Sequence, residues 1–161
     1  MDLNRYTFRS VWRLDATSDD VFEVLADLEH YPLWWPEVQR AEPLHHSSSE
    51  LIVRSLLPYD LTFSSSQTRR DRFAGILEAS MHGDLDGFSR WTLTTAGTSC
   101  TAVFEEEVIA HKPLLRHLAL VARPASQANH RLMMRHGQAG LQTYLSGYSA
   151  ALRRTHLGHQ Q

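Results

Sequence analysis

The sequence predicts an α+β fold in which seven antiparallel strands form a sheet against a long C-terminal helix. Residues 37–110 contain six segments of strand-forming residues separated by short turns, and residues 5–14 form a further strand that precedes two short helices. Strands joined by such short connections pair in an antiparallel manner. Between residues 124 and 152, apolar residues recur every three or four positions, which is the period of one helix face.

The first strand and the helix after it have clear local signals. In residues 5–14 aromatic residues and leucine alternate with arginine and threonine, as expected of a half-buried strand. A helix is predicted to begin near Thr17, whose hydroxyl can cap it. Asp19 and Asp20 follow in the first turn, where the helix dipole favours negative charge. The aromatic, proline-containing residues 31–36 predict a second short turn or helix.

The later strands place one carboxylate among large apolar side chains. The six strands are predicted near residues 37–45, 49–57, 60–70, 72–81, 87–95 and 99–110. In the last of them, alternation puts Glu106 on the same face as Phe104 and Val108. A carboxylate on a buried face must be paired, hydrogen-bonded or protonated, because burying an isolated charge is costly.

The long helix has an inner stripe of mixed size. Its members are His130, Met134, Gly137, Leu141, Tyr144, Tyr148 and Leu152. At 1.5 Å per residue the helix would be about 40 Å long, enough to cross a small domain. Glycine inside a helix costs about 1 kcal/mol relative to alanine. The three glycines 137, 140 and 147 therefore indicate either close packing on the sheet or room left for a ligand.

Two segments raise the question of macromolecular partners. Residues 111–123 predict a short amphipathic helix that packs over the mouth of the core, with a transient membrane or acyl-carrier contact as the alternative. The basic run Arg69, Arg70 and Arg72 predicts a solvated face, with an anionic headgroup or acyl carrier as the alternative. The chain is expected to form one domain, residues 1–155, followed by a polar tail at 156–161.

Composition excludes several classes of function. A net charge of −2 and a pI near 6.5 offer no basic excess for nucleic acid. The single cysteine, Cys100, cannot form an internal disulfide and suits a reducing cytoplasm. No apolar run is long enough for a signal peptide or a membrane span, so we expect a cytoplasmic protein. The sequence leaves open whether it is a monomer or a homodimer.

Metal and nucleophile motifs are missing from the sequence. His130 and His136 are six residues apart, as are His111 and His117, so neither pair shares a helix face. The chain contains no CxxC, HExxH, Gly-Xaa-Ser-Xaa-Gly or phosphate-loop pattern. We therefore expect no protein-bound metal and no cofactor, and we interpret Cys100 as an ordinary small residue.

The order of elements, together with several local motifs, resembles the START-like (SRPBCC) superfamily. The matching segments are residues 16–22, 25–27, 31–38, 89–93, 101–104 and 129–141. Within that superfamily the chain is similar to the polyketide cyclase/dehydrase and lipid-transport group. The resemblance covers essentially the whole chain. It implies the helix-grip fold, in which a curved sheet wraps around the long helix and encloses a deep apolar cavity.

Such a cavity suggests a set of lining residues. The ligand-binding candidates are Trp34, Trp35, Phe63, Leu77, Met81, Trp91, Phe104, Met133, Met134 and Leu141. The adjacent residues Trp34 and Trp35 diverge by about 100° on a helix, so one is expected in the core and the other at the cavity rim. Residues 129–137 of the long helix should face the ligand, and residues 141–152 should pack on the sheet.

Glu106 and His130 are the candidate catalytic residues. A carboxylate beside an imidazole in the cavity could move protons during an aldol-type cyclisation or a dehydration. The same two residues could instead form a polar pair that anchors the helix to the sheet. Two functions follow. The first is binding of a hydrophobic small molecule, such as a lipid, isoprenoid or polyketide. The alternative is a polyketide cyclase or aromatase that uses the same cavity.

Overall fold

The computed structural model describes residues 4–54, 59–111 and 119–158. These residues form seven strands, two α-helices and one 3₁₀-helix. The elements are β1 (Arg5–Leu14), α1 (Ser18–Ala26), η1 (Leu28–Leu33), β2 (Val38–His45), β3 (Ser48–Arg54), β4 (Asp60–Asp71), β5 (Ile76–Gly83), β6 (Leu85–Ala96), β7 (Ser99–Ala110) and α3 (Ala119–Gly158). The strands form one antiparallel sheet in the order β1-β7-β6-β5-β4-β3-β2.

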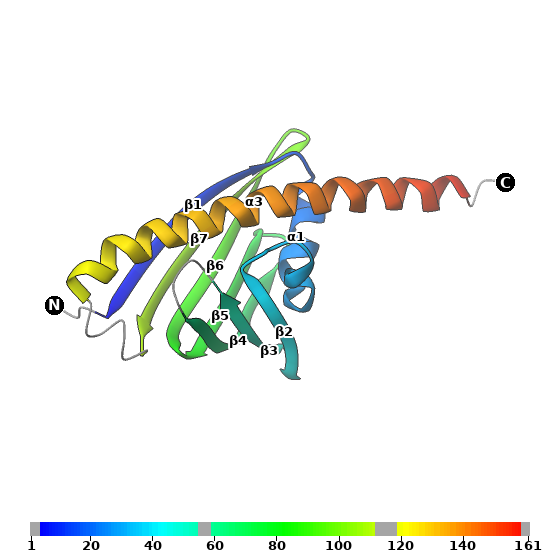
Figure 1. Cartoon of the computed structure of the whole chain (residues 1–161). Helices are drawn as coiled ribbons and strands as arrows, with labels where there is room; N and C mark the ends of the chain where they lie inside the picture. The colour runs from blue at the N-terminus through cyan, green and yellow to red at the C-terminus, as the bar shows by residue number, and fades with distance from the viewer. Residues whose placement is uncertain (1–3, 55–58, 112–118, 159–161) are drawn as a thin grey trace.

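The curved sheet holds α3 along its open side, as Figure 1 shows. The helices α1 and η1 close one end of the sheet, and the last turns of α3 extend past them. The predicted α+β helix-grip architecture is therefore confirmed. Thr17 caps α1 as expected, because its hydroxyl accepts a hydrogen bond from the backbone N–H of Asp20 at 3.2 Å.

Two predicted boundaries were wrong. The fifth strand begins at Ile76 instead of residue 72, because a turn occupies residues 72–75. Asp71 accepts a hydrogen bond from the N–H of Ala74 in this turn, and Gly75 adopts a left-handed φ of 69°. The expected helix break before Pro124 is also absent, because α3 starts at Ala119 and contains this proline. Pro124 lies in the second turn, where it removes one intrahelical hydrogen bond.

Parts of the earlier predictions fall on undescribed residues. The third strand was expected to reach residue 57, and β3 is described to Arg54. Of the predicted helix at 111–123, residues 112–118 lie outside the described residues. A membrane or acyl-carrier contact through this segment stays a prediction. At its other end α3 continues to Gly158, past Leu152 and into the expected polar tail.

The helix glycines permit close packing at two positions. A Cβ atom on Gly137 would lie 2.7 Å from Cε2 of Trp35, and one on Gly140 would overlap the carbonyl oxygen of Trp34. At Gly147 nothing lies within 4 Å of such an atom. The first two glycines therefore let α3 approach the Trp34–Trp35 backbone and ring. Beyond them Leu141 and Leu145 are buried, which fixes this turn of α3 in the core.

Candidate functional site

A cavity of about 210 Å³ lies between the concave face of the sheet and the first half of the described part of α3. Every strand contributes to it, mostly through alternate residues, and Val38 contributes from the start of β2. Of the residues predicted to line it, the cavity contains Trp35, Phe63, Leu77, Met81, Trp91, Phe104, Met133, Met134, Glu106 and His130. Strand alternation therefore identified the concave face correctly.

Two predicted lining residues lie elsewhere. Trp34 and Leu141 are both buried in the core and do not line the cavity. Trp34 stacks on Trp35 at 5.4 Å between ring centroids, and its backbone lies against Gly140. Leu141 lies one helical turn beyond Gly137, where α3 has already closed onto the aromatic core. The expectation that one of the two adjacent tryptophans plugs the core and the other borders the cavity agrees with this arrangement.

Trp35 connects the floor of the cavity to α3. Its indole N–H donates a hydrogen bond to the backbone carbonyl of Met133 at 3.0 Å. Its ring meets Trp12 edge-on at 5.5 Å, and Trp12 in turn contacts Trp91 at 4.7 Å. These large rings have few rotatable bonds, so they give the cavity a rigid base. Met133 and Met134 of α3 add flexible apolar surface to the lining.

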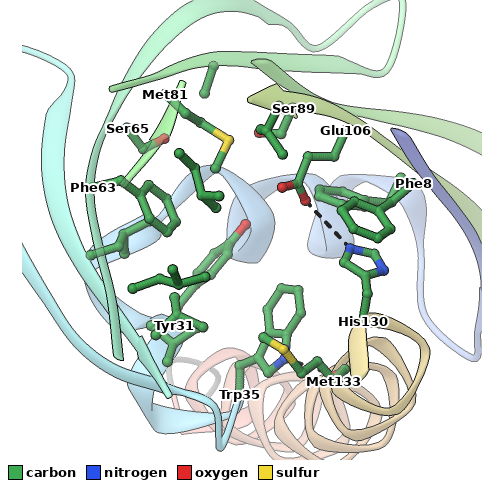
Figure 2. A pocket seen from close by; sticks show the side chains of 18 of the residues that line it. Phe8, Tyr31, Trp35, Phe63, Ser65, Met81, Ser89, Glu106, His130 and Met133 are labelled. Carbon is green, nitrogen blue, oxygen red and sulfur yellow. Dashed lines mark hydrogen bonds and ion pairs between the residues drawn. The ribbon is translucent and has the colours of Figure 1, made fainter. Parts of the chain in front are cut away.

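The carboxylate and the imidazole meet inside the cavity. Nε2 of His130 lies 3.5 Å from Oε2 of Glu106, and the two side chains are 15% and 10% exposed. Figure 2 shows them pointing toward one another from α3 and from the sheet. Glu106 is on the concave face because β7 alternates strictly between buried and half-buried positions. The contact joins the long helix to the sheet, and it also brings two titratable groups together at an apolar wall.

Aromatic stacking fixes the imidazole. The ring of His130 is nearly parallel to that of Phe8, with centroids 3.9 Å apart and an angle of 7° between planes. The ring of Phe104 also stacks on that of His130, with the two centroids 6.0 Å apart. In the sheet, Phe8 lies directly opposite Glu106 on the adjacent strand. His130 is therefore held in plane beside the carboxylate by β1 and β7 together.

Tyrosine side chains supply further polar atoms. The hydroxyls of Tyr6 and Tyr59 are buried without a hydrogen-bond partner among the described residues, and both side chains line the cavity. Burial raises the pKa of Tyr59, and the nearby Tyr6 adds to this effect. Tyr31 differs, because its hydroxyl donates to the carbonyl of Leu25 at 2.7 Å. Burial also raises the pKa of Tyr31 well above its usual range, so its phenol stays neutral.

Sequence reasoning missed several lining residues. Alternation puts Tyr6 and Phe8 on one face of the half-buried first strand, but it does not connect that face to the cavity. The pairing of β1 beside β7 explains the omission, since Tyr6 lies opposite Val108 although about a hundred residues separate them along the chain. Tyr31 and Tyr59 come from non-strand segments, which carry no alternation to indicate their direction.

Other candidate features make contacts within the fold. Arg69 pairs with Asp71 at 2.9 Å, and Arg70 and Arg72 both pair with Glu23 of α1. The basic run thus fastens the β4–β5 turn to α1. Burial raises the pKa of the Cys100 thiol, which suits a core residue. Among the described residues, no group of three His, Cys, Asp or Glu side chains could hold a metal ion.

No described helix has both the length and the hydropathy needed to cross a bilayer. This finding concerns the described residues alone.

The fold and cavity define a START-like protein of the helix-grip class. By sequence, residues 14–135 match the family described as polyketide cyclase / dehydrase and lipid transport, and the chain belongs to this family. No curated protein sequence matches the chain.

Solved structures share the fold at low sequence identity. The ZhuI aromatase/cyclase from Streptomyces sp. R1128 superposes with a TM-score of 0.74 at 15% identity, over 88% of this chain and 94% of that one. A START superfamily protein from Mycobacterium smegmatis gives 0.72 at 14% identity, over 88% and 98% of the two chains. Norcoclaurine synthase from Thalictrum flavum, in complex with dopamine and hydroxybenzaldehyde, gives 0.60 at 14%, over 85% and 86%.

Proposed function

We propose that the chain binds a hydrophobic small molecule in the cavity between the sheet and α3. The observation that carries this proposal is the lining, which is apolar or aromatic at most positions and includes a few polar side chains. This is the usual composition of a small-molecule site. A volume of about 210 Å³ suits a compact ligand, such as a short isoprenoid, a lipid fragment or a polyketide-like aromatic molecule. The two methionines let the cavity adapt to its shape.

The relatives support the same proposal. The family description names lipid transport beside cyclisation, and both tasks need an apolar cavity. Norcoclaurine synthase, with a similar fold, has been crystallised with dopamine and hydroxybenzaldehyde, which are small aromatic compounds. For this chain, the ligand would lie between the β-strands and α3, against Trp35 and Trp91.

Native mass spectrometry of freshly purified protein tests the proposal. We expect either a copurified apolar ligand, seen as added mass that disappears on organic extraction, or saturable uptake of a neutral hydrophobic dye. Trp35 and Trp91 line the cavity, so uptake should also change tryptophan emission. Absence of both a bound ligand and saturable dye uptake would contradict the proposal.

A second candidate function is cyclisation or dehydration of a polyketide-like chain. The contact between Glu106 and His130 favours it, because the cavity then contains a proton acceptor and a proton donor side by side. In an aldol closure, Glu106 would take a proton from a carbon between two carbonyls. That carbon would then attack a different carbonyl, further along the substrate chain. Protonated His130 would give its proton to the new alkoxide. Transfer of the first proton from Glu106 to His130 restores both groups.

Turnover of a poly-β-ketone substrate separates the two candidates. If the chain is a cyclase, Glu106→Gln should abolish cyclisation while the circular dichroism spectrum is retained. Glu105→Gln is the matched control, since Glu105 is the neighbouring residue on the outer face of β7 and is half exposed. Equal turnover by the wild type and the Glu106→Gln variant would remove the catalytic role of this residue and leave the binding function.

A further inference from the structure

The Glu106 carboxylate is an acceptor with unused capacity. Its side chain is 10% exposed, and among the described residues its one polar partner is His130, at 3.5 Å. An ionised carboxylate can accept about four hydrogen bonds, and water normally supplies those that protein does not. In the cavity, apolar side chains surround the group, so a bound ligand that displaces water must replace those hydrogen bonds.

The described neighbours of Glu106 in the sheet donate no hydrogen bond to it. Phe8 lies directly opposite it on β1, and Ser89 lies opposite it on β6 and lines the cavity without a hydrogen bond to the carboxylate. His130 is held by stacking against Phe8, so its ring cannot turn without losing that contact. Figure 2 shows the carboxylate directed into the open space between these side chains.

We propose that the ligand presents a neutral hydrogen-bond donor, a phenolic or alcoholic hydroxyl, to Glu106, and that the cavity rejects carboxylate ligands such as fatty acids. This inference rests on the proposed binding function and narrows its ligand class. A hydroxyl satisfies the carboxylate with a charge-assisted hydrogen bond. An ether or a hydrocarbon offers no donor. A second carboxylate is repelled by the first, and the apolar wall strengthens that repulsion.

The cost of desolvation separates a hydroxyl from an ammonium group. A charged amine could also donate to Glu106, but it would have to leave water for a wall formed by Phe8, Phe104 and Met81. His130 already lies beside the carboxylate, so a cationic ligand would compete with the imidazole for it. A neutral donor avoids both penalties.

Three ligands of nearly equal size test the inference by calorimetric titration at neutral pH. These are 2-naphthol, which has a hydroxyl; 2-methoxynaphthalene, which has the oxygen but no donor; and the anion 2-naphthoate. We expect 2-naphthol to bind at least about tenfold more tightly than 2-methoxynaphthalene. A single hydrogen bond to a charged group raises the affinity by roughly that factor or more. The anion should bind most weakly of the three.

Variants assign the preference to its residue. In Glu106→Gln the advantage of 2-naphthol over 2-methoxynaphthalene should shrink, and 2-naphthoate should gain affinity. Glu105→Gln, on the outer face, should behave as wild type. If the wild type binds the three ligands within a factor of about two of one another, or if Glu106→Gln keeps the full preference, the inference is overturned while the binding function stands. If none of the three binds, the inference is overturned, and the dye-uptake measurement decides separately whether the binding function stands.

Discussion

His130 of α3 and Glu106 of β7 meet inside an apolar cavity, with Nε2 of the imidazole 3.5 Å from Oε2 of the carboxylate. The contact joins the two elements that form opposite walls of the cavity. It therefore has a structural consequence for the packing of α3 as well as the proposed roles in ligand recognition and proton transfer.

The contribution of this contact to stability can be measured by a double-mutant cycle. We expect His130→Leu to destabilise the protein by about 1–3 kcal/mol, because it leaves a largely buried carboxylate without its partner. Adding Glu106→Leu should recover part of that loss, so the two effects should be coupled by about 1 kcal/mol or more. Urea unfolding of the wild type, both single variants and the double variant gives the coupling. Strictly additive effects would show that the two side chains do not interact.

The close approach of α3 predicts opposite effects of one substitution at two glycines. Gly140→Ala should destabilise the protein by about 1–3 kcal/mol or more. The new methyl group would overlap the carbonyl oxygen of Trp34, which belongs to the backbone and cannot rotate away. Gly147→Ala meets no atom within 4 Å and should stabilise by up to about 1 kcal/mol through helix propensity. Thermal unfolding compares the two. Destabilisation by Gly147→Ala, or stabilisation by Gly140→Ala, would contradict this packing.

The tyrosine hydroxyls predict a second contrast. Tyr6→Phe removes a buried hydroxyl that has no partner among the described residues, so stability should stay the same or rise by up to about 1 kcal/mol. Tyr31→Phe removes the hydrogen bond to the Leu25 carbonyl and should cost about 1–2 kcal/mol. Denaturant unfolding of the two variants provides the measurement. A clear loss of stability in Tyr6→Phe would show that its hydroxyl is bonded in solution.

The β5–β6 turn predicts a dependence of stability on pH. The N–H of Gly83 donates to Asp86 and holds the pKa of this carboxyl below its ordinary value of 3.8, and His111 adds to the effect at 2.7 Å. Because the folded pKa is depressed, the stabilisation is complete above the unfolded pKa and is lost as the pH falls through the folded one.

Asp86→Asn should consequently be less stable than wild type at neutral pH, and the difference should shrink as the solution is acidified below pH values of about 4. Urea unfolding at a series of pH values measures it. A difference that is constant across this range would mean that the ionised form of Asp86 contributes nothing.

Local patterns predicted the elements of this fold better than their limits. Alternation placed Glu106 on the inner face, and the three-to-four spacing placed His130 on the inner side of α3, because both depend only on near neighbours in the chain. The contact between them depends on the register between distant segments, which spacing does not reveal. The same limit explains Leu141. Its place on the inner stripe was predicted correctly, but whether it lines the cavity depends on where along α3 the helix meets the tryptophans.

Turn chemistry explains the remaining differences. The turn at residues 72–75 contains Arg72 and Phe73 before Gly75, and these residues are equally compatible with a strand in the sequence alone. Pro124 favoured a helix start, but a proline early in a helix removes only one hydrogen bond, and the helix continues through it.

The central claim is that the cavity binds an apolar ligand, and a substitution that fills it tests this claim most directly. Ala79 of β5 lines the cavity, whereas its neighbour Ser80 does not line it and lies opposite Phe88 of β6 in the register. We expect calorimetric titration with 2-naphthol to show saturable binding to the wild type and to Ser80→Phe, and to show at least about a tenfold loss in Ala79→Phe. Equal binding by Ala79→Phe and Ser80→Phe would contradict the account, because the ligand would then lie outside the cavity.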